Sequence, residues 1–240
     1  MSFKEIARQF ASRHKSLRER AVAIHDYVRE IPFGFTWKFD GADADFTLKR
    51  RVGHCTPKSE LFSQLLRSAG FPDARVVGVK IPNNVLHGYG AFPDTLHHTF
   101  VEVTVEGRSC RVDSFIVDPE LFNAAKLRLE REGREFGYGI HAQGTCDWDG
   151  QSDAFSQYFD SKRMARSEEK RFESTADLLN EPMYEHKGLS TLRSIPLLGW
   201  AVGSLLLESK NSVINQLRQE GISEESKKEQ PQKGRSAGAC

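Results

Sequence analysis

The stretch from residue 98 to residue 117 most constrains how this chain folds, because it has the pattern of a β-hairpin. Residues 98–105 alternate strictly along the run, Glu106-Gly107 is a turn signal, and residues 109–117 form a second β-rich run. In such a hairpin the numbers of paired residues add up to about 213, so His98 lies opposite about residue 115. Asp113 is the next residue on the same face of that strand and is a diagonal neighbour of His98. We therefore expect His98 and Asp113 to meet on one face of an antiparallel ribbon.

A second strong pattern is an amphipathic helix over residues 55–69. Its apolar stripe recurs at helical spacing and consists of Leu61, Phe62, Leu65 and Leu66. Thr56-Pro57 suits a helix start, because proline is tolerated in the first turn, and Gly70 suits a helix end. The pattern predicts that Cys55 lies at the N-terminus of this helix.

The remaining segments complete the predicted order of elements. We predict helix over residues 3–30 and 43–51, a short strand or extended loop over 33–41, and a strand over 74–80. Beyond the hairpin we predict helical stretches over 120–135 and 152–180 with a glycine-rich piece between them. Helices followed by antiparallel strands indicate an α+β fold.

Length and composition indicate one main domain with a C-terminal extension. The chain has 240 residues, and we assign 1–190 to the main domain. Residues 191–218 form an apolar helical segment, and residues 219–240, which lack aromatic side chains, are expected to be disordered. The uncharged run 195–207 is shorter than the roughly 20 residues that span a bilayer, so we favour docking on the core over membrane contact.

Charge and cysteine content exclude several classes of protein. Lysine and arginine number 34 and aspartate and glutamate 33, so no bulk positive field attracts nucleic acid. The four cysteines, at positions 55, 110, 146 and 240, show no CxxC spacing and are too few for a disulfide scaffold. The N-terminal residues 1–20 lack the apolar region of a secretory signal. We expect a cytoplasmic protein with reduced thiols.

Cys55, His98 and Asp113 together have the residue types of a thiol-based catalytic site. A cysteine nucleophile needs a lowered thiol pKa, a nearby base and a group that orients the base. The N-terminus of a helix favours the thiolate, and its free N–H groups stabilise an oxyanion on the substrate. Taken alone, Cys55 reads more simply as a small buried side chain. All three residue types at the ends of neighbouring elements are much harder to attribute to chance.

Two sequence blocks resemble the transglutaminase-like superfamily. The first is GHCTPKSELFSQLLRSAGFPDARVVG, the second is HHTFVEVTVEGRSCRVDSF, and the resemblance covers about residues 20–118. It implies a papain-like fold in which the nucleophile opens a helix that packs on an antiparallel sheet. It also implies that Cys55 is the nucleophile, His98 the base and acid, and Asp113 the orienting residue. No cofactor and no metal are implied, and Trp37 is the candidate for an additional oxyanion donor.

The chain departs from the family pattern in the second block. The family usually has Asp-Pro there, whereas Asp113 is followed by Ser114 and Asp118-Pro119 stands five residues further on. Asp118 is therefore an alternative third member, although the separation of 15 residues between His98 and Asp113 suits the family better. Cys110 stands where the family often has tryptophan, and we interpret it as a packing residue.

The resemblance implies acyl transfer through a cysteine acyl-enzyme at an amide, peptide or thioester carbonyl. The acceptor is water in a protease or amidase and an amine in a transglutaminase or N-acyltransferase, and the sequence does not decide between them. The alternative is a binding or scaffold protein that keeps the fold without catalysis. A metal site at His87, His97 and His98 is disfavoured, because adjacent strand residues point to opposite faces.

Overall fold

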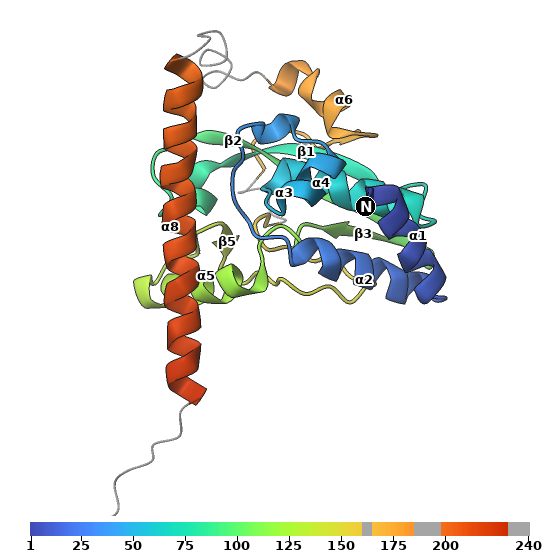
Figure 1. The fold of residues 1–240 in the computed structure, drawn as a ribbon, viewed down its shortest axis with the longest axis horizontal. Coiled ribbons are helices and arrows are strands. Elements are labelled where there is room, and N and C mark those ends of the chain that lie inside the picture. The colour runs from blue at the N-terminus through green and yellow to red at the C-terminus, as the bar shows by residue number, and fades with distance from the viewer. Residues whose placement is uncertain (160–164, 185–197, 230–240) are drawn as a thin grey trace, which may run out of the picture.

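The protein is built around a four-stranded antiparallel sheet with the strand order β3-β2-β1-β6 (Figure 1). The computed structural model describes residues 1–159, 165–184 and 198–229. The strands of this sheet are β1 (Arg75–Pro82), β2 (Thr95–Val105), β3 (Arg108–Val112) and β6 (Lys170–Phe172). A separate two-stranded ribbon is formed by β4 (Phe136–Gly137) and β5 (Ile140–His141). The combination of helices and antiparallel strands confirms the predicted α+β class.

Helices precede and follow the sheet in the chain. The α-helices are α1 (Phe3–Arg13), α2 (Leu17–Arg29), α3 (Ala44–Arg50), α4 (Cys55–Ser68), α5 (Pro119–Glu132), α6 (Thr175–Leu179) and α8 (Leu198–Glu229). Short 3-10 helices are η1 (Phe39–Gly41), η2 (Asn83–Leu86) and η3 (Pro182–Tyr184). The predicted helical region 3–30 is divided because Ser16 caps α2, its hydroxyl accepting a bond from the Glu19 N–H at 3.3 Å.

The core lies on both faces of the sheet. On one face the buried leucines of α4 join the inward valines of β2, a set that includes Leu61, Leu65, Val101 and Val103. On the other face Phe100 packs with side chains of β1 and with Tyr158. Burying an aliphatic or aromatic side chain contributes about 1.5–3 kcal/mol, so the first of these clusters fixes α4 against β2.

Residues 152–180 are mostly not helical, contrary to our prediction. Residues 152–159 form an irregular segment that bridges to β3, since Ala154 pairs with Val112. Within 165–184 the structure has the strand β6 and the five-residue helix α6. The apparent helical spacing was misleading because the apolar side chains of this region, such as Tyr158 and Phe172, pack against the sheet.

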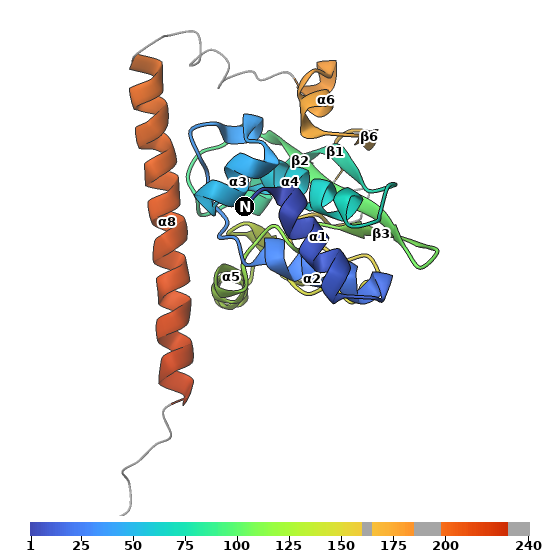
Figure 2. The same ribbon diagram turned by 45° about the vertical axis from the view of Figure 1, so that its right-hand side comes forward.

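The helix α8 is longer than the sequence predicted. It runs alongside α5 and continues to Glu229, so residues 219–229, which we expected to be disordered, are helical (Figures 1 and 2). The physical reason is close packing past residue 218: a side chain at Gly221 would meet Ala124 of α5 at 2.5 Å. Residues 195–197 of the apolar run and residues 230–240 lie outside the described residues.

Candidate functional site

Cys55 is the first residue of α4, as predicted, with His54 as the capping residue. The first N–H groups of a helix have no acceptor within the helix, and Pro57 at the third position contributes no N–H at all. The N–H groups of Cys55 and Thr56 therefore point out of the helix start beside the thiol. This end of the helix carries the positive part of the helix dipole, which favours a thiolate and an oxyanion.

The β2–β3 hairpin brings His98 to Asp113. The register pairs Val105 with Arg108 and Val101 with Val112, which confirms the predicted pairing. Glu106 and Gly107 form the turn with φ values of 49° and 83°, the left-handed conformation that a two-residue hairpin turn requires. The Nε2 atom of His98 lies 2.9 Å from Oδ2 of Asp113, and both side chains are buried.

The same strand is tied to the nucleophile helix. The Thr99 hydroxyl donates to the Ser59 hydroxyl at 3.1 Å, and the Ser59 hydroxyl lies 3.4 Å from the Thr99 carbonyl oxygen. These bonds hold the neighbour of His98 against the second turn of α4. The His98 imidazole lies within hydrogen-bonding reach of the Cys55 thiol. The structure thus brings Cys55, His98 and Asp113 together.

The two ionisable groups at the centre of this cluster stabilise each other's charged forms. Burial lowers the pKa of His98, but its hydrogen bonds to Asp113 and Cys55 and their negative charges raise this pKa to about 9. Burial raises the pKa of Cys55, but the hydrogen bond from His98 and the positive charges of His54 and His98 bring it below the ordinary thiol value. Both shifts favour the thiolate–imidazolium pair over the neutral pair.

Asp113 is held by a segment that the sequence did not identify. Its Oδ2 atom accepts the Tyr158 N–H at 2.7 Å, and its Oδ1 atom accepts the Gln157 N–H and the Ser156 hydroxyl, each at 3.2 Å. The Tyr158 ring also stacks on the His98 ring with centroids 6.0 Å apart. A carboxylate with this many donors remains fixed in place and directs the N–H of His98 Nε2 toward itself. Backbone donors carry no residue-type signal, so sequence reasoning had no means of finding them.

Asp118, the alternative third member of the triad, bonds to groups other than His98. Its carboxylate caps α5 by accepting the Leu121 N–H at 3.2 Å, and it accepts the Phe33 N–H at 2.8 Å. It also forms a two-point ion pair with Arg218 of α8, at 2.7 and 2.9 Å. Burial raises the pKa of Asp118, but its bonds to Arg218 lower it below the usual value. Asp118 joins structural elements, and His98 is bonded to Asp113 instead.

Trp37 is not brought to this cluster. Its side chain is 58% exposed, and its ring packs edge-on against Phe46 of α3 with centroids 5.8 Å apart. The Nζ atom of Lys38 lies 5.8 Å from the Trp37 ring centroid. These contacts belong to the surface of the turn before η1 and do not support the predicted role as an oxyanion donor. Cys110, by contrast, is fully buried in β3, in keeping with a packing residue.

Lys58 is a buried amine beneath the start of α4, and the sequence analysis did not single it out. Its Nζ atom donates to the carbonyl oxygens of Ile31 at 2.6 Å, Ile116 at 2.8 Å and Arg29 at 3.4 Å. Burial lowers the pKa of Lys58 to about 7. Three carbonyl acceptors match the three donors of an ammonium group, so Lys58 fixes the first turn of α4 against α2 and the residues after β3.

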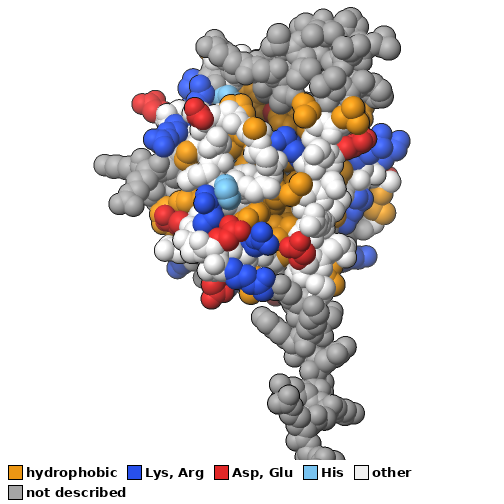
Figure 3. Space-filling view, turned by 90° about the vertical axis from the view of Figure 1, so that its left-hand side faces the viewer, with side chains coloured by type: hydrophobic (Ala, Val, Ile, Leu, Met, Phe, Trp, Pro, Cys, Tyr) orange, Lys and Arg blue, Asp and Glu red, His pale blue; other side chains and the backbone are white. Residues whose placement is uncertain are grey.

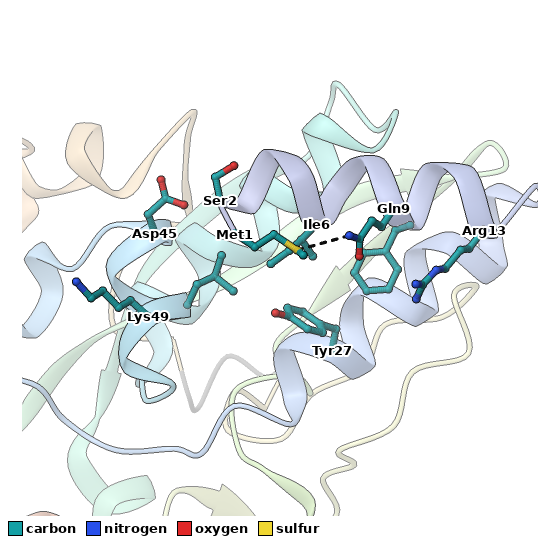
Figure 4. A pocket seen from close by; sticks show the side chains of 10 residues that line it. Met1, Ser2, Ile6, Gln9, Arg13, Tyr27, Asp45 and Lys49 are labelled. Atoms are coloured by element: carbon teal, nitrogen blue, oxygen red, sulfur yellow. Dashed lines mark hydrogen bonds between the residues drawn. The ribbon is translucent and has the colours of Figure 1, made fainter.

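A cavity of about 800 Å³ lies elsewhere, between α1, α2 and α3 (Figure 4). Residues that line it include Ile6, Tyr27 and Leu48, and none of Cys55, His98 and Asp113 is among them. It is therefore separate from the cysteine cluster. In the described ranges, no helix combines the length and the hydropathy needed to cross a membrane.

Comparison with known families gives one match, over the N-terminal part of the chain. Residues 4–114 match the family model described as the transglutaminase-like superfamily. No curated protein and no solved structure gave a significant match to the chain. The matched range contains nearly all of α1, together with α2 to α4, β1, the hairpin and all three clustered residues. The part of the chain that carries Cys55, His98 and Asp113 therefore matches the model of the transglutaminase-like superfamily.

Proposed function

We propose that this protein is an enzyme that transfers an acyl group from an amide, peptide or thioester carbonyl through an acyl-enzyme on Cys55. The observation that carries the proposal is the chain of contacts from the thiol to His98 and on to Asp113 at the N-terminus of α4. The superfamily typically performs cysteine-based acyl transfer or proteolysis, which supports the same reading.

In the first half of the reaction, the Cys55 thiolate attacks the substrate carbonyl carbon. The carbonyl oxygen takes up the negative charge, and the N–H groups of Cys55 and Thr56 at the helix start stabilise it. As the carbon–nitrogen or carbon–sulfur bond breaks, the imidazolium of His98 gives its proton to the leaving amine or thiol. The product of this half is a thioester on Cys55 with neutral His98.

In the second half, His98 takes a proton from water or from an amine, which attacks the thioester carbonyl. The carbon–sulfur bond breaks, the thiolate returns and His98 is again an imidazolium. Asp113 holds the imidazole in one tautomer through both halves, because its Oδ2 atom accepts the N–H of Nε2 at 2.9 Å. The choice between hydrolysis and transfer depends on the acceptor.

We infer a peptide, a protein or a small amide or thioester as the substrate, and no role for nucleic acid. The near balance of charge, at +1, gives no electrostatic support for binding a polyanion. The free thiols of Cys55, Cys110 and Cys146 suit a reducing compartment, and we place the protein in the cytoplasm. The alternative, a non-catalytic binding or scaffold protein, has less support because a scaffold has no need of the buried pair of His98 and Asp113.

The test is to trap the acyl-enzyme. The protein is incubated at neutral pH with a small acyl thioester, and the mass of the intact chain and of its Cys55 peptide is measured. We expect an adduct on Cys55 that disappears when water or an added amine accepts the acyl group, and no adduct in Cys55→Ala. His98→Ala should form the adduct far more slowly. A chain that remains unmodified while folded would support the scaffold alternative.

A further inference from the structure

A second imidazole–carboxylate pair stands directly beside the nucleophile. His54 is the capping residue of α4 and immediately precedes Cys55. Its Nε2 atom lies 2.8 Å from Oδ1 of Asp40, which belongs to η1. His54 is 4% exposed and Asp40 is 7% exposed, so water competes little for this bond. The mechanism above uses neither residue.

Side chains from several elements surround this pair. The His54 ring is flanked by Phe39 and Phe35, with ring centroids 4.6 and 5.2 Å away. The carboxylate of Asp40 also accepts hydrogen bonds from the side chains of Thr56 and Tyr184. Asp40 is therefore fixed from α4, from η3 and from His54 itself, and it can orient the imidazole.

The other ring nitrogen of His54 has no partner among the described residues. Its Nδ1 atom is buried and makes no hydrogen bond with any described part of the chain. A buried polar atom without a partner carries a desolvation cost of about 1–3 kcal/mol, so its presence beside the nucleophile requires an explanation. The two groups that bear on the charge of His54 are Asp40 and Cys55, and both are anionic in the thiolate state.

The balance of charge favours a protonated His54. Burial among aromatic rings lowers the pKa of His54, but the hydrogen bond and charge of Asp40 and the charge of Cys55 raise it above the ordinary value. In return, the positive charge of His54 lowers the pKa of the Cys55 thiol, whereas the direct effect of Asp40 raises it. Asp40 thus has two opposite effects on the pKa of the Cys55 thiol. Its own charge raises this pKa, and by keeping His54 protonated it lowers it.

We propose that His54, held by Asp40, is a second cation of the site that stabilises the Cys55 thiolate together with His98. His98 must give up its proton to the leaving group, and His54 is then the cation that stays beside Cys55. It acts through Cys55 and is a positioning residue. This inference deepens the proposed function and rests on Cys55 being the nucleophile.

The experiment is the pH dependence of Cys55 alkylation by iodoacetamide, measured by peptide mass spectrometry in four proteins. These are the wild type, His54→Gln, Asp40→Asn and the control His87→Gln, which makes the same change at an exposed histidine. We expect His54→Gln to raise the thiol pKa by about one unit, because a nearby opposite charge is lost. The control should leave it unchanged.

The variant Asp40→Asn shows whether Asp40 changes the thiol pKa mainly through His54 or mainly by its own charge. If His54 is the cation that matters, this nearly isosteric change neutralises the imidazole and raises the thiol pKa as His54→Gln does. If Asp40 acts only directly, removing its charge lowers the thiol pKa, and that result overturns the inference. Should His54→Gln fail to fold in a thermal unfolding check, Asp40→Asn and NMR titration of the His54 ring carry the test, and a neutral ring at pH 7 also overturns it.

The pKa of Cys55 in the wild type and in His54→Gln distinguishes a failure of the proposed function from a failure of the second-cation role of His54. A wild-type Cys55 that titrates like an ordinary thiol, near pH 8.5, contradicts the proposed function itself. A wild-type Cys55 with a low pKa that does not change in His54→Gln contradicts only the second cation.

Discussion

Arg218 and Asp118, one hundred positions apart in the chain, form a buried two-point ion pair in which Nη2 lies 2.7 Å from Oδ2 and Nε 2.9 Å from Oδ1. Arg218 lies on α8, and Asp118 caps α5 and accepts the Phe33 N–H. Residues 32–34 in turn pair with Gly53, since the Gly34 N–H donates to the Gly53 carbonyl oxygen at 3.2 Å. A helix outside the family match therefore supports the segment that leads into Cys55.

Arg218→Ala should destabilise the protein by about 3–5 kcal/mol, because it leaves the buried carboxylate of Asp118 without its cation. Urea unfolding at neutral pH measures the change. The matched control is Ser212→Ala, an exposed substitution on the same helix. The double variant Arg218→Ala/Asp118→Asn should recover part of the loss, and equal stability of Arg218→Ala and wild type would mean that α8 is not anchored here.

Gly221→Ala should destabilise the protein, although alanine in place of glycine usually stabilises a helix by about 1 kcal/mol. The reason is that a Cβ atom at position 221 would meet the Ala124 Cβ atom at 2.5 Å. Combining it with Ala124→Gly removes the collision and should restore stability. Thermal unfolding of the two single variants and the double variant measures the effect, and a stabilised Gly221→Ala would show that α8 does not pack on α5 in this way.

Removing residues 195–240 should destabilise the chain, because it removes the contacts that α8 makes with the rest of the protein. The truncation deletes Arg218 and also Asn211, whose side chain forms two hydrogen bonds of 2.8 Å with the backbone of Phe35. Leu205 and Leu206 of α8 are exposed, and Figure 3 faces this side of the molecule, where hydrophobic and charged side chains lie next to one another. A truncated chain as stable as the full one would favour a partner or a membrane as the role of the segment.

Asp113→Asn should lower activity far more than Asp118→Asn. An asparagine at 113 can present its amide N–H to His98 and favour the wrong tautomer, and the analogous change in a serine triad costs on the order of 10⁴-fold. Asp118→Asn should lower the unfolding temperature through the loss of the Arg218 pair while activity per folded molecule stays close to wild type. Steady-state kinetics and thermal unfolding of both variants separate the effects; the reverse order of activity losses would reassign the orienting role to Asp118.

The hairpin, the nucleophile helix and their meeting point were predictable because they depend on local patterns. Alternation over residues 98–105 and the turn at Glu106-Gly107 determine the register that places His98 near Asp113. The apolar stripe of α4 and the Thr56-Pro57 start similarly determine where Cys55 lies. These features depend on residues close together in the chain, so a single sequence is enough to predict them.

The remaining parts of the site depend on contacts that no local pattern reports. Asp113 is held by backbone N–H groups more than 40 positions away, at residues 156–158, and any residue type supplies such a donor. His54 is adjacent to Cys55 in sequence, yet its importance depends on Asp40, which only the folded chain places beside it. Trp37 was chosen by family analogy alone, and in the structure its side chain is largely exposed.

Stability should depend on pH through His98. Its pKa rises from an ordinary 6.5 to about 9 in the folded protein, so its contribution to stability is fully present below pH 6.5 and is lost as pH rises through 9. Asp113→Asn removes a cause of the raised pKa and should flatten this dependence. The lowered pKa of Cys55 acts in the opposite sense, so urea unfolding at pH 6, 7.5 and 9 compares Cys55→Ala with Cys55→Ala/Asp113→Asn, and a Cys55→Ala chain that gains stability over this range would contradict the prediction.

The pH dependence of wild-type Cys55 alkylation tests the central claim most directly. Iodoacetamide rates are followed for each cysteine peptide between pH 5 and pH 10, with Cys110 and Cys146 as internal references, because burial raises the pKa of both. We expect Cys55 to react fast at pH 6 and to reach its plateau well below pH 8.5, while Cys110 and Cys146 stay slow. A Cys55 rate that rises only around pH 8.5, like that of a free thiol, would contradict the account of an activated nucleophile.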